Sequence, residues 1–188
     1  ETIMATTSTV TAAVSSDIAF VFTDSAGGSS ITESAALGYS LSLGTGIGTG
    51  QINAAVKYTG YLPKGGYTSI DFTAFPKTIL GGEYNVNFTS VKGVVIENQW
   101  NGSGDIGTAY AIESPAHVAN LLISADISNG FTGLFNESTD AIRIGPQSTW
   151  LFNDRIGIGP SSSNKILKLA DMNGSGVPVA LVVVGVTG

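Results

Sequence analysis

Cysteine is absent from the 188 residues, and histidine occurs only once, at His117. Disulfides therefore cannot stabilise the fold, and thiol chemistry and cysteine-based zinc sites are excluded. Charged residues make up 12% of the chain against 43% hydrophobic residues, about half the usual charged share. The hydrophobic content suffices for a core, so the polar surface must come mainly from Ser, Thr, Asn and Gly. This profile is typical of extracellular and virion β-proteins and of surfaces that pack against copies of themselves.

Basic clusters and long apolar runs are also missing. The eight Lys and Arg residues are scattered singly, and the formal net charge is −6. Nucleic-acid binding requires a basic patch, and a membrane-spanning helix needs about 20 apolar residues, so we expect neither a nucleic-acid partner nor membrane insertion. Glu1 precedes Met4, which leaves two expectations open: a start at Met4 with a remnant before it, or cleavage of a longer precursor before Glu1.

An uninterrupted apolar segment over residues 178–186 is the strongest feature that is present. Its valines favour a strand over a helix because they branch at Cβ. A strand with one wet face would alternate apolar and polar residues, and this one does not. We therefore predict a core strand covered on both faces, formed by Val179, Leu181, Val182, Val183, Val184 and Val186.

The remaining chain reads as short strands separated by turns. Residues 17–23 and 91–98 combine aromatic and β-branched residues, a composition typical of strands. Clusters of Gly, Pro, Asn and Asp recur about every 8–12 residues and separate roughly ten to twelve strands. The sequence thus predicts an all-β fold, an antiparallel β-sandwich with a barrel as the alternative.

The first 14 residues are rich in Thr and Val but carry little that could pack a core. We predict an extended N-terminal arm over residues 1–14, followed by a single β-sandwich domain over residues 15–188. We expect the arm to add as a strand to a neighbouring copy. The residues that carry this prediction are Thr6, Thr7, Thr9, Val10, Thr11 and Val14.

Three motifs resemble parts of known sites, for a nucleotide, for hydrolysis and for calcium, and none of them is complete. Glycines alternate from Gly44 to Gly50, but a strand-like segment follows them, whereas a dinucleotide loop needs a helix. His117 lacks the Gly-x-Ser-x-Gly elbow of a hydrolase. The segment from Asp171 begins like a calcium loop, but its twelfth position is Val182 and not Glu. We therefore predict no catalytic, cofactor-binding or metal-binding residue, and a casual surface Ca²⁺ site is the remaining cofactor alternative.

Candidate surface sites are few. Asn-x-Ser/Thr triplets in predicted loops offer glycosylation acceptors if the protein is exported, although a chain rich in Ser, Thr and Asn produces such triplets by chance; they are Asn101, Asn136 and Asn173. Five aromatic residues could line a sugar groove, but packing in the core and at interfaces explains them better; they are Tyr58, Tyr61, Tyr67, Trp100 and Trp150.

Several segments occur together in a familiar order: residues 69–72 (SIDF), 91–98 (VKGVVIEN), 142–146 (IRIGP), 150–152 (WLF), 165–170 (KILKLA) and 182–186 (VVVGV). In this order the chain resembles small virion structural proteins of tailed phages and environmental viruses, over about residues 65–188. The matching motifs are core strands and turns. The resemblance implies a jelly-roll-like β-sandwich that assembles in many copies on a capsid or tail, and it transfers no catalytic residue.

The primary interpretation is a non-enzymatic, self-assembling structural protein, a capsid or tail component of a virion. Its expected partners are copies of itself and other virion or surface-assembly proteins, and its expected location is virion or extracellular. The alternative is the subunit of a bacterial or archaeal extracellular filament, tube or surface layer, which would share the low charge and the lack of cysteine. A carbohydrate-binding module is the third interpretation.

Overall fold

The computed structural model describes residues 12–26, 29–79, 82–100, 119–126, 128–135, 139–172, 174 and 176–188, with side chains described outside residues 12–41 and 77–84. In this part of the chain strands dominate, with one short 3-10 helix, η1 (Thr132–Leu134), and no helix that could cross a membrane. The predicted all-β class is confirmed. The strands are β1 (Ala12–Ala26), β2 (Ser29–Thr45), β3 (Gln51–Ile52), β4 (Ala54–Leu62), β5 (Tyr67–Asp71), β6 (Phe75–Ile79), β7 (Gly82–Val86), β8 (Phe88–Asn98), β9 (Leu121–Ala125), β10 (Ala141–Ile144), β11 (Ser148–Ile158), β12 (Ile166–Asp171) and β13 (Val177–Thr187).

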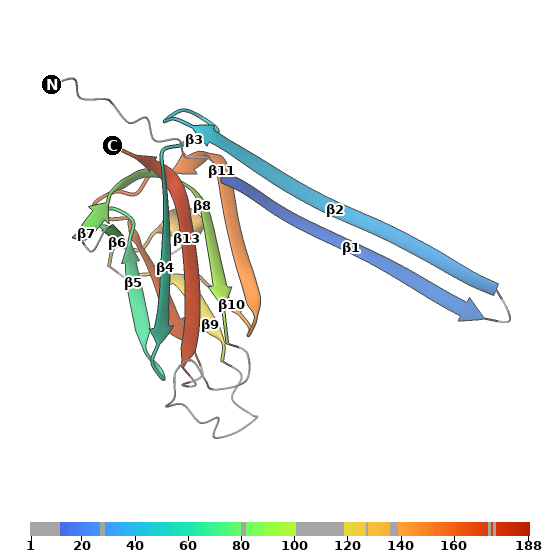
Figure 1. Cartoon of the computed structure of the whole chain (residues 1–188). Coiled ribbons are helices and arrows are strands. Elements are labelled where there is room, and N and C mark those ends of the chain that lie inside the picture. The colour runs from blue at the N-terminus through green and yellow to red at the C-terminus, as the bar shows by residue number, and fades with distance from the viewer. Residues whose placement is uncertain are drawn as a thin grey trace.

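Two four-stranded sheets form the body of the molecule in a sandwich-like arrangement (Figure 1). One sheet has the order β11-β8-β13-β4 and is called here the β13 sheet, and the other has the order β10-β9-β12-β5 and is called the β12 sheet. Every pairing within them is antiparallel, which confirms the antiparallel prediction. A separate hairpin, β6–β7, lies between β5 and β8 in the chain.

The main hydrophobic core lies between these sheets. The β13 sheet contributes Ile96 and Leu181, and the β12 sheet contributes Leu169, all with 0% exposure. Because successive residues of a strand point to opposite faces, each sheet supplies one face to this core. Phe72 and Phe131 pack edge to face in it, with ring centroids 4.7 Å apart.

Strand β13 occupies an inner position, paired with β8 on one side and β4 on the other. Toward the main core, Val183 is 0% exposed. On the outer face, Val184 is buried in a second cluster with Leu43 and Ile52, and the half-buried Val182 packs against that cluster. Both faces of β13 therefore carry buried valine, and the cover is denser on the inner face.

Strands β1 and β2 form a long antiparallel hairpin, from the pair Ala12–Leu43 to the pair Ala26–Ser29. The hairpin joins neither four-stranded sheet; β2 pairs in parallel with the short strand β3, which precedes β4. Figure 1 shows the hairpin extending away from the two sheets. The residues expected to form strand over 17–23 thus lie in this projecting element and outside the sandwich-like body.

A buried amide connects three strand ends at one end of the sandwich. Asn98, at the end of β8, has 0% exposure. Its Nδ2 donates hydrogen bonds to the carbonyl oxygens of Ala119 at 2.7 Å and Ile144 at 3.3 Å. Its Oδ1 accepts one from the Trp100 amide at 3.1 Å. Satisfying a buried amide in this way avoids a desolvation penalty of about 1–3 kcal/mol.

An ion pair joins β5 to the start of β12. Lys165 Nζ lies 2.8 Å from Asp71 Oδ2, and Asp71 Oδ1 accepts hydrogen bonds from the amide and hydroxyl of Thr73. Burial acts to raise the pKa of Asp71, but the hydrogen bonds from Lys165 and Thr73 and the charge of Lys165 together hold this pKa below its ordinary value.

The lowered pKa of Asp71 generates a pH prediction. A carboxyl group with a lowered folded-state pKa stabilises the protein above its unfolded pKa of about 3.9, and this contribution is lost as the pH falls through the folded value. We expect Asp71→Asn to reduce the free energy of unfolding by about 1 kcal/mol at neutral pH, because the pair is partly exposed. Denaturant melts at several pH values should show this deficit shrinking below about pH 4.

Lys165→Met supplies the control for this prediction, since it removes the partner and keeps Asp71. The two substitutions should be non-additive in a double-mutant cycle. A deficit of Asp71→Asn that is the same at neutral and strongly acidic pH would contradict the assignment.

The side chains on the inner face of β13 are more deeply buried than Val182 on its outer face, and this difference generates a second prediction. An unpaired charge buried in the core costs several kcal/mol, against a total stability of about 5–15 kcal/mol for a domain. Val183→Asp should therefore unfold the protein. Val182→Asp should be tolerated with a smaller loss in dilute solution, because a carboxylate at this half-buried position can reach water. Thermal melts of the two variants measure the difference, and a benign Val183→Asp would show that the core does not depend on this strand.

Candidate assembly surface

The sequence-predicted site residues fall in three parts of the chain. The core-strand residues all lie in β13, and Val14 lies in β1. The other arm residues, the three candidate glycosylation acceptors and the single histidine lie outside the described residues; they are Thr6, Thr7, Thr9, Val10, Thr11, Asn101, Asn136, Asn173 and His117. The predictions on those positions stay predictions.

The backbone of the glycine-rich segment between β2 and β3 forms hydrogen bonds with other parts of the chain. The amide of Gly46 donates to the Ile52 carbonyl at 2.9 Å, and the amide of Gly50 donates to the Arg155 carbonyl at 2.9 Å. Lys92, only 2% exposed, donates from Nζ to the carbonyls of Gly48 at 2.8 Å and Arg155 at 3.1 Å. These contacts hold the base of the β1–β2 hairpin against β11 and β8, and β3 follows the segment where a phosphate-binding loop would need a helix.

The carboxylate of Asp171 accepts hydrogen bonds from two neighbouring loops. Its Oδ2 accepts hydrogen bonds from the amides of Gly65 and Gly176, both at 2.9 Å. These two amides come from the β4–β5 and β12–β13 loops, so the buried carboxylate joins two turns at one end of the molecule. Within the described ranges, no group of three His, Cys, Asp or Glu residues is placed to hold a metal ion.

The aromatic residues weighed for a sugar groove divide between the core and the surface. Tyr58, Trp100 and Trp150 pack against the main core. Tyr67 is 63% exposed, and Lys168 Nζ lies 4.3 Å from the centroid of its ring, a cation–π contact that occupies one face of the ring.

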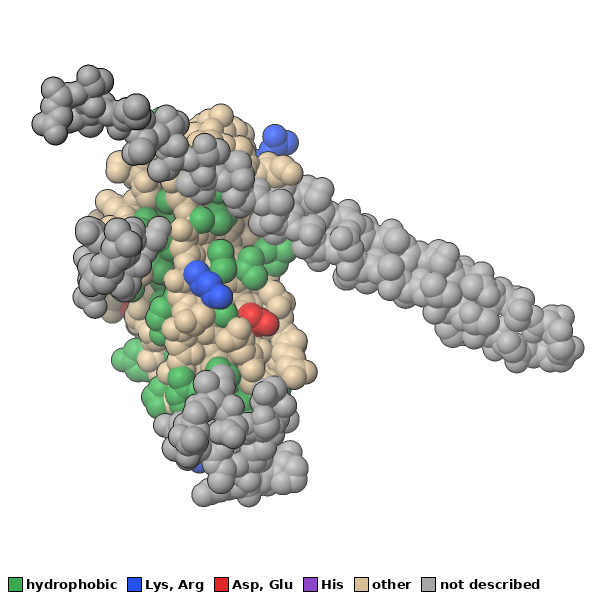
Figure 2. Space-filling view, in the orientation of Figure 1, with side chains coloured by type: hydrophobic (Ala, Val, Ile, Leu, Met, Phe, Trp, Pro, Cys, Tyr) green, Lys and Arg blue, Asp and Glu red, His purple; other side chains and the backbone are tan. Residues whose placement is uncertain are grey.

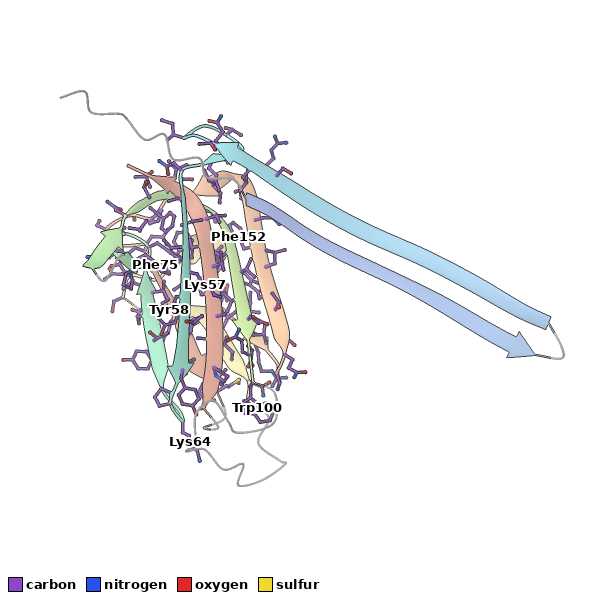
Figure 3. All side chains as sticks on the ribbon, viewed as in Figure 1. Lys57, Tyr58, Lys64, Phe75, Trp100 and Phe152 are labelled. Atoms are coloured by element: carbon purple, nitrogen blue, oxygen red, sulfur yellow. The ribbon has the colours of Figure 1, made fainter. Side chains whose placement is uncertain are left out.

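The outer face of the β13 sheet carries a row in which three of the four residues are apolar. Their neighbours in sequence point into the core, so these residues point outward. In register across four strands the row contains Lys57, Val182, Val95 and Leu151. Lys57 is exposed, and the three apolar residues are half-buried. Figure 2 shows hydrophobic side chains on this face interspersed with basic and acidic groups, and Figure 3 locates Lys57 on it.

The outer face of the β12 sheet is more polar. One row across it contains Ser69, Lys168 and Ser124, and the next contains Tyr67, Ala170, Leu122 and Arg143. The cations Lys168 and Arg143 stand among these positions, where the β13 sheet has valine and leucine. The β12 sheet thus has a cation in each of these outer rows, whereas the β13 sheet has one mainly apolar row beside a row that contains Thr59, Glu97 and Thr149.

One corner of the apolar face is already covered by the chain itself. Leu43 at the end of β2 and Ile52 of β3, with 2% and 0% exposure, lie on Val184. A Cβ on Gly93, beside Val184 in register, would lie 2.8 Å from Val184 Cγ2. Glycine at this position therefore leaves the space into which Val184 packs. Val182, on the same outer face, also packs against this cluster and is half-buried.

The register of the β1–β2 hairpin divides its positions into two unlike faces. Paired residues of an antiparallel ribbon share a face, and alternate positions share it along each strand. The face that includes Leu43 holds apolar residues at most positions: Ala12, Val14, Ile18, Phe20, Phe22, Ile31, Ala35, Leu37, Tyr39 and Leu41. The other face holds mainly small and polar residues: Ser15, Asp17, Thr23, Ser25, Ser30, Thr32, Ser34, Ala36, Ser40 and Ser42.

This apolar hairpin face was missed when the arm was placed at residues 1–14. The signal was present in the sequence as alternation over residues 37–43. The apolar positions of the two strands form one face only because the register pairs Leu41 with Val14 and Leu37 with Ile18.

Two comparisons with known proteins found no match. No protein-family model matches the chain, and the search of curated proteins finds no significant match.

Proposed function

We propose that the chain is a non-enzymatic, self-assembling structural protein built on a jelly roll, with a capsid or tail component of a virion as the primary assignment. The observation that carries the proposal is the order in which the eight strands of the two sheets pair. Two surfaces that suit assembly support it further. The protein would then act in a virion or outside the cell, with copies of itself and other virion or surface-assembly proteins as partners.

The pairing order supports a jelly roll because it is nested from the ends inward. The first strand of the body pairs with the last (β4 with β13), and the next strands pair likewise: β5 with β12, β8 with β11 and β9 with β10. Rolling up such a ribbon brings β8 beside β13 and β9 beside β12, and both of these pairs are present. Eight-stranded, double-sheet jelly rolls recur in viral capsid and lectin domains.

A fold does not by itself define a function, so the support for one of these uses comes from the surfaces. The apolar outer face of the β13 sheet and the apolar face of the β1–β2 hairpin favour protein contacts over sugar binding. Interfaces of permanent oligomers are larger and more hydrophobic than transient ones. Few charges on the chain reduce the repulsion between copies.

An extracellular filament, tube or surface layer is the alternative assembly. A projecting hairpin that contacts a different surface on the next copy gives a head-to-tail interface, which closes into a ring or continues as a filament. The shape of the assembled particle distinguishes the two assignments.

Self-assembly is directly measurable. The purified full-length protein should form oligomers or polymers at tens of micromolar, seen by light scattering and by negative-stain electron microscopy. Closed shells or rings would favour the virion assignment, and open filaments the alternative. A strictly monomeric protein over this concentration range would contradict the proposed function.

The N-terminal arm provides a separate test. We propose that the arm predicted over residues 1–14 adds as a strand to a neighbouring copy, and the test removes its first eleven residues, which precede β1. Their deletion should leave the thermal melting temperature of the body unchanged within about 2 °C, because they contribute little to a core, and should impair assembly. Normal assembly of the truncated protein would contradict a role for the arm.

A further inference from the structure

We infer that the β1–β2 hairpin of one copy lies with its apolar face on the outer face of the β13 sheet of a second copy. This inference rests on the proposed self-assembly and specifies its contact. The observation is the presence of two surfaces with apolar positions in one chain: one face of a projecting ribbon, placed by its register, and one row on a sheet of the body.

The hairpin needs a partner surface. A two-stranded ribbon is marginally stable in water on its own, and a third strand or a packed face is needed to stabilise it. The apolar positions of this hairpin run along β1 and β2 on one side, between the pair Ala12–Leu43 and the pair Asp24–Ile31. Such a face, left in water over its whole length, would be an aggregation hazard.

The length of the hairpin favours contact with the sheet of a second copy over contact with the sheet of its own chain. β1 contains 15 residues and β2 contains 17, so the ribbon is about 50 Å long at 3.3 Å per residue. The four strands of the receiving sheet span only about 15–20 Å at the usual strand spacing. Figure 1 shows the hairpin leading away from its own body, so it reaches beyond its own sheet toward a neighbour.

The base of the hairpin already makes this kind of contact within one chain. Leu43 belongs to the apolar face of the hairpin, and it is buried on the outer face of β13 against Val184, next to Val182. Leu41 and Tyr39 continue the same face along β2. The contact with the second copy therefore repeats, on the row formed by Val182, Val95 and Leu151, a packing that the chain uses at its own corner.

The charges at the ends of the two surfaces are complementary. Toward the tip of the hairpin, the otherwise apolar face includes Asp24 and Glu33. The receiving row ends at the β4 edge in the exposed Lys57, and the exposed Glu97 of the next row lies farther from that edge, on β8. We expect the tip of the hairpin to approach the β4 edge of the neighbouring sheet.

Two adjacent alanines provide a matched test. Ala35 pairs with Phe20 on the apolar face, and Ala36 pairs with Ala19 on the opposite face. Ala35→Asp should raise the concentration required for assembly by at least about tenfold, since it introduces a charge into a buried contact. Ala36→Asp should leave that concentration within about twofold. Light scattering across a dilution series measures both, and equal effects of the two substitutions would overturn the inference.

Crosslinking identifies the receiving surface, and the absence of cysteine makes single thiols specific. Thr149 is exposed and lies in register with Glu97 on the outer face of the β13 sheet. A chain with Ala35→Cys, mixed with a chain with Thr149→Cys and a short bis-maleimide, should give a heterodimer. Ala36→Cys in place of Ala35→Cys should give markedly less.

The other outcomes of crosslinking overturn the inference. An Ala35→Cys homodimer as the main product would indicate that two hairpins pack together. A chain that carries both Ala35→Cys and Thr149→Cys and closes on itself as a crosslinked monomer would indicate that the hairpin covers its own sheet. An assembled protein without the heterodimer would leave the proposed self-assembly standing and remove this contact, whereas a monomeric parent protein would remove both.

Discussion

Covering β13 on both faces is the constraint on which the rest of the structure depends. Its inner face meets the β12 sheet across the main core, where Val183 is fully buried. Its outer face is covered in part by the three-stranded sheet β1-β2-β3, from which Leu43 and Ile52 lie over Val184. Next to this cluster on the same face, Val182 is only half-buried. The requirement for apolar cover therefore links the interior of the sandwich to the base of the hairpin and to the surface proposed for assembly.

Buried polar side chains hold the loops in the places that this packing requires. Lys92 binds two carbonyl groups and fastens the segment between β2 and β3, which carries Ile52 to its place over Val184. At the other end of the sandwich, Asn98 and Asp171 bind backbone groups of neighbouring loops. All three side chains thus bind backbone groups of the protein itself.

The sequence predicts the all-β class and the buried strand well, because each depends on local patterns: uninterrupted valine at β13 and frequent turn clusters. The pairing of β4 with β13 cannot be predicted from local sequence, since the paired residues are 115 to 131 positions apart and many strands share their composition. The apolar hairpin face was missed for a related reason: alternation within β2 shows one edge of it, and only the register with β1 shows a surface. The candidate acceptors Asn101, Asn136 and Asn173 stay predictions.

The central claim is that the hairpin completes the cover of β13 sheets between copies. Amide hydrogen exchange, measured by mass spectrometry on the full chain, tests it most directly, because exchange reports the local opening of a strand pair. In dilute, unassembled protein, peptides from β1 and β2 should exchange quickly while β13 stays protected. In assembled protein, the hairpin should become protected, together with the edge strand β11 of the receiving sheet. Protection of the hairpin that is the same in both states would contradict the account.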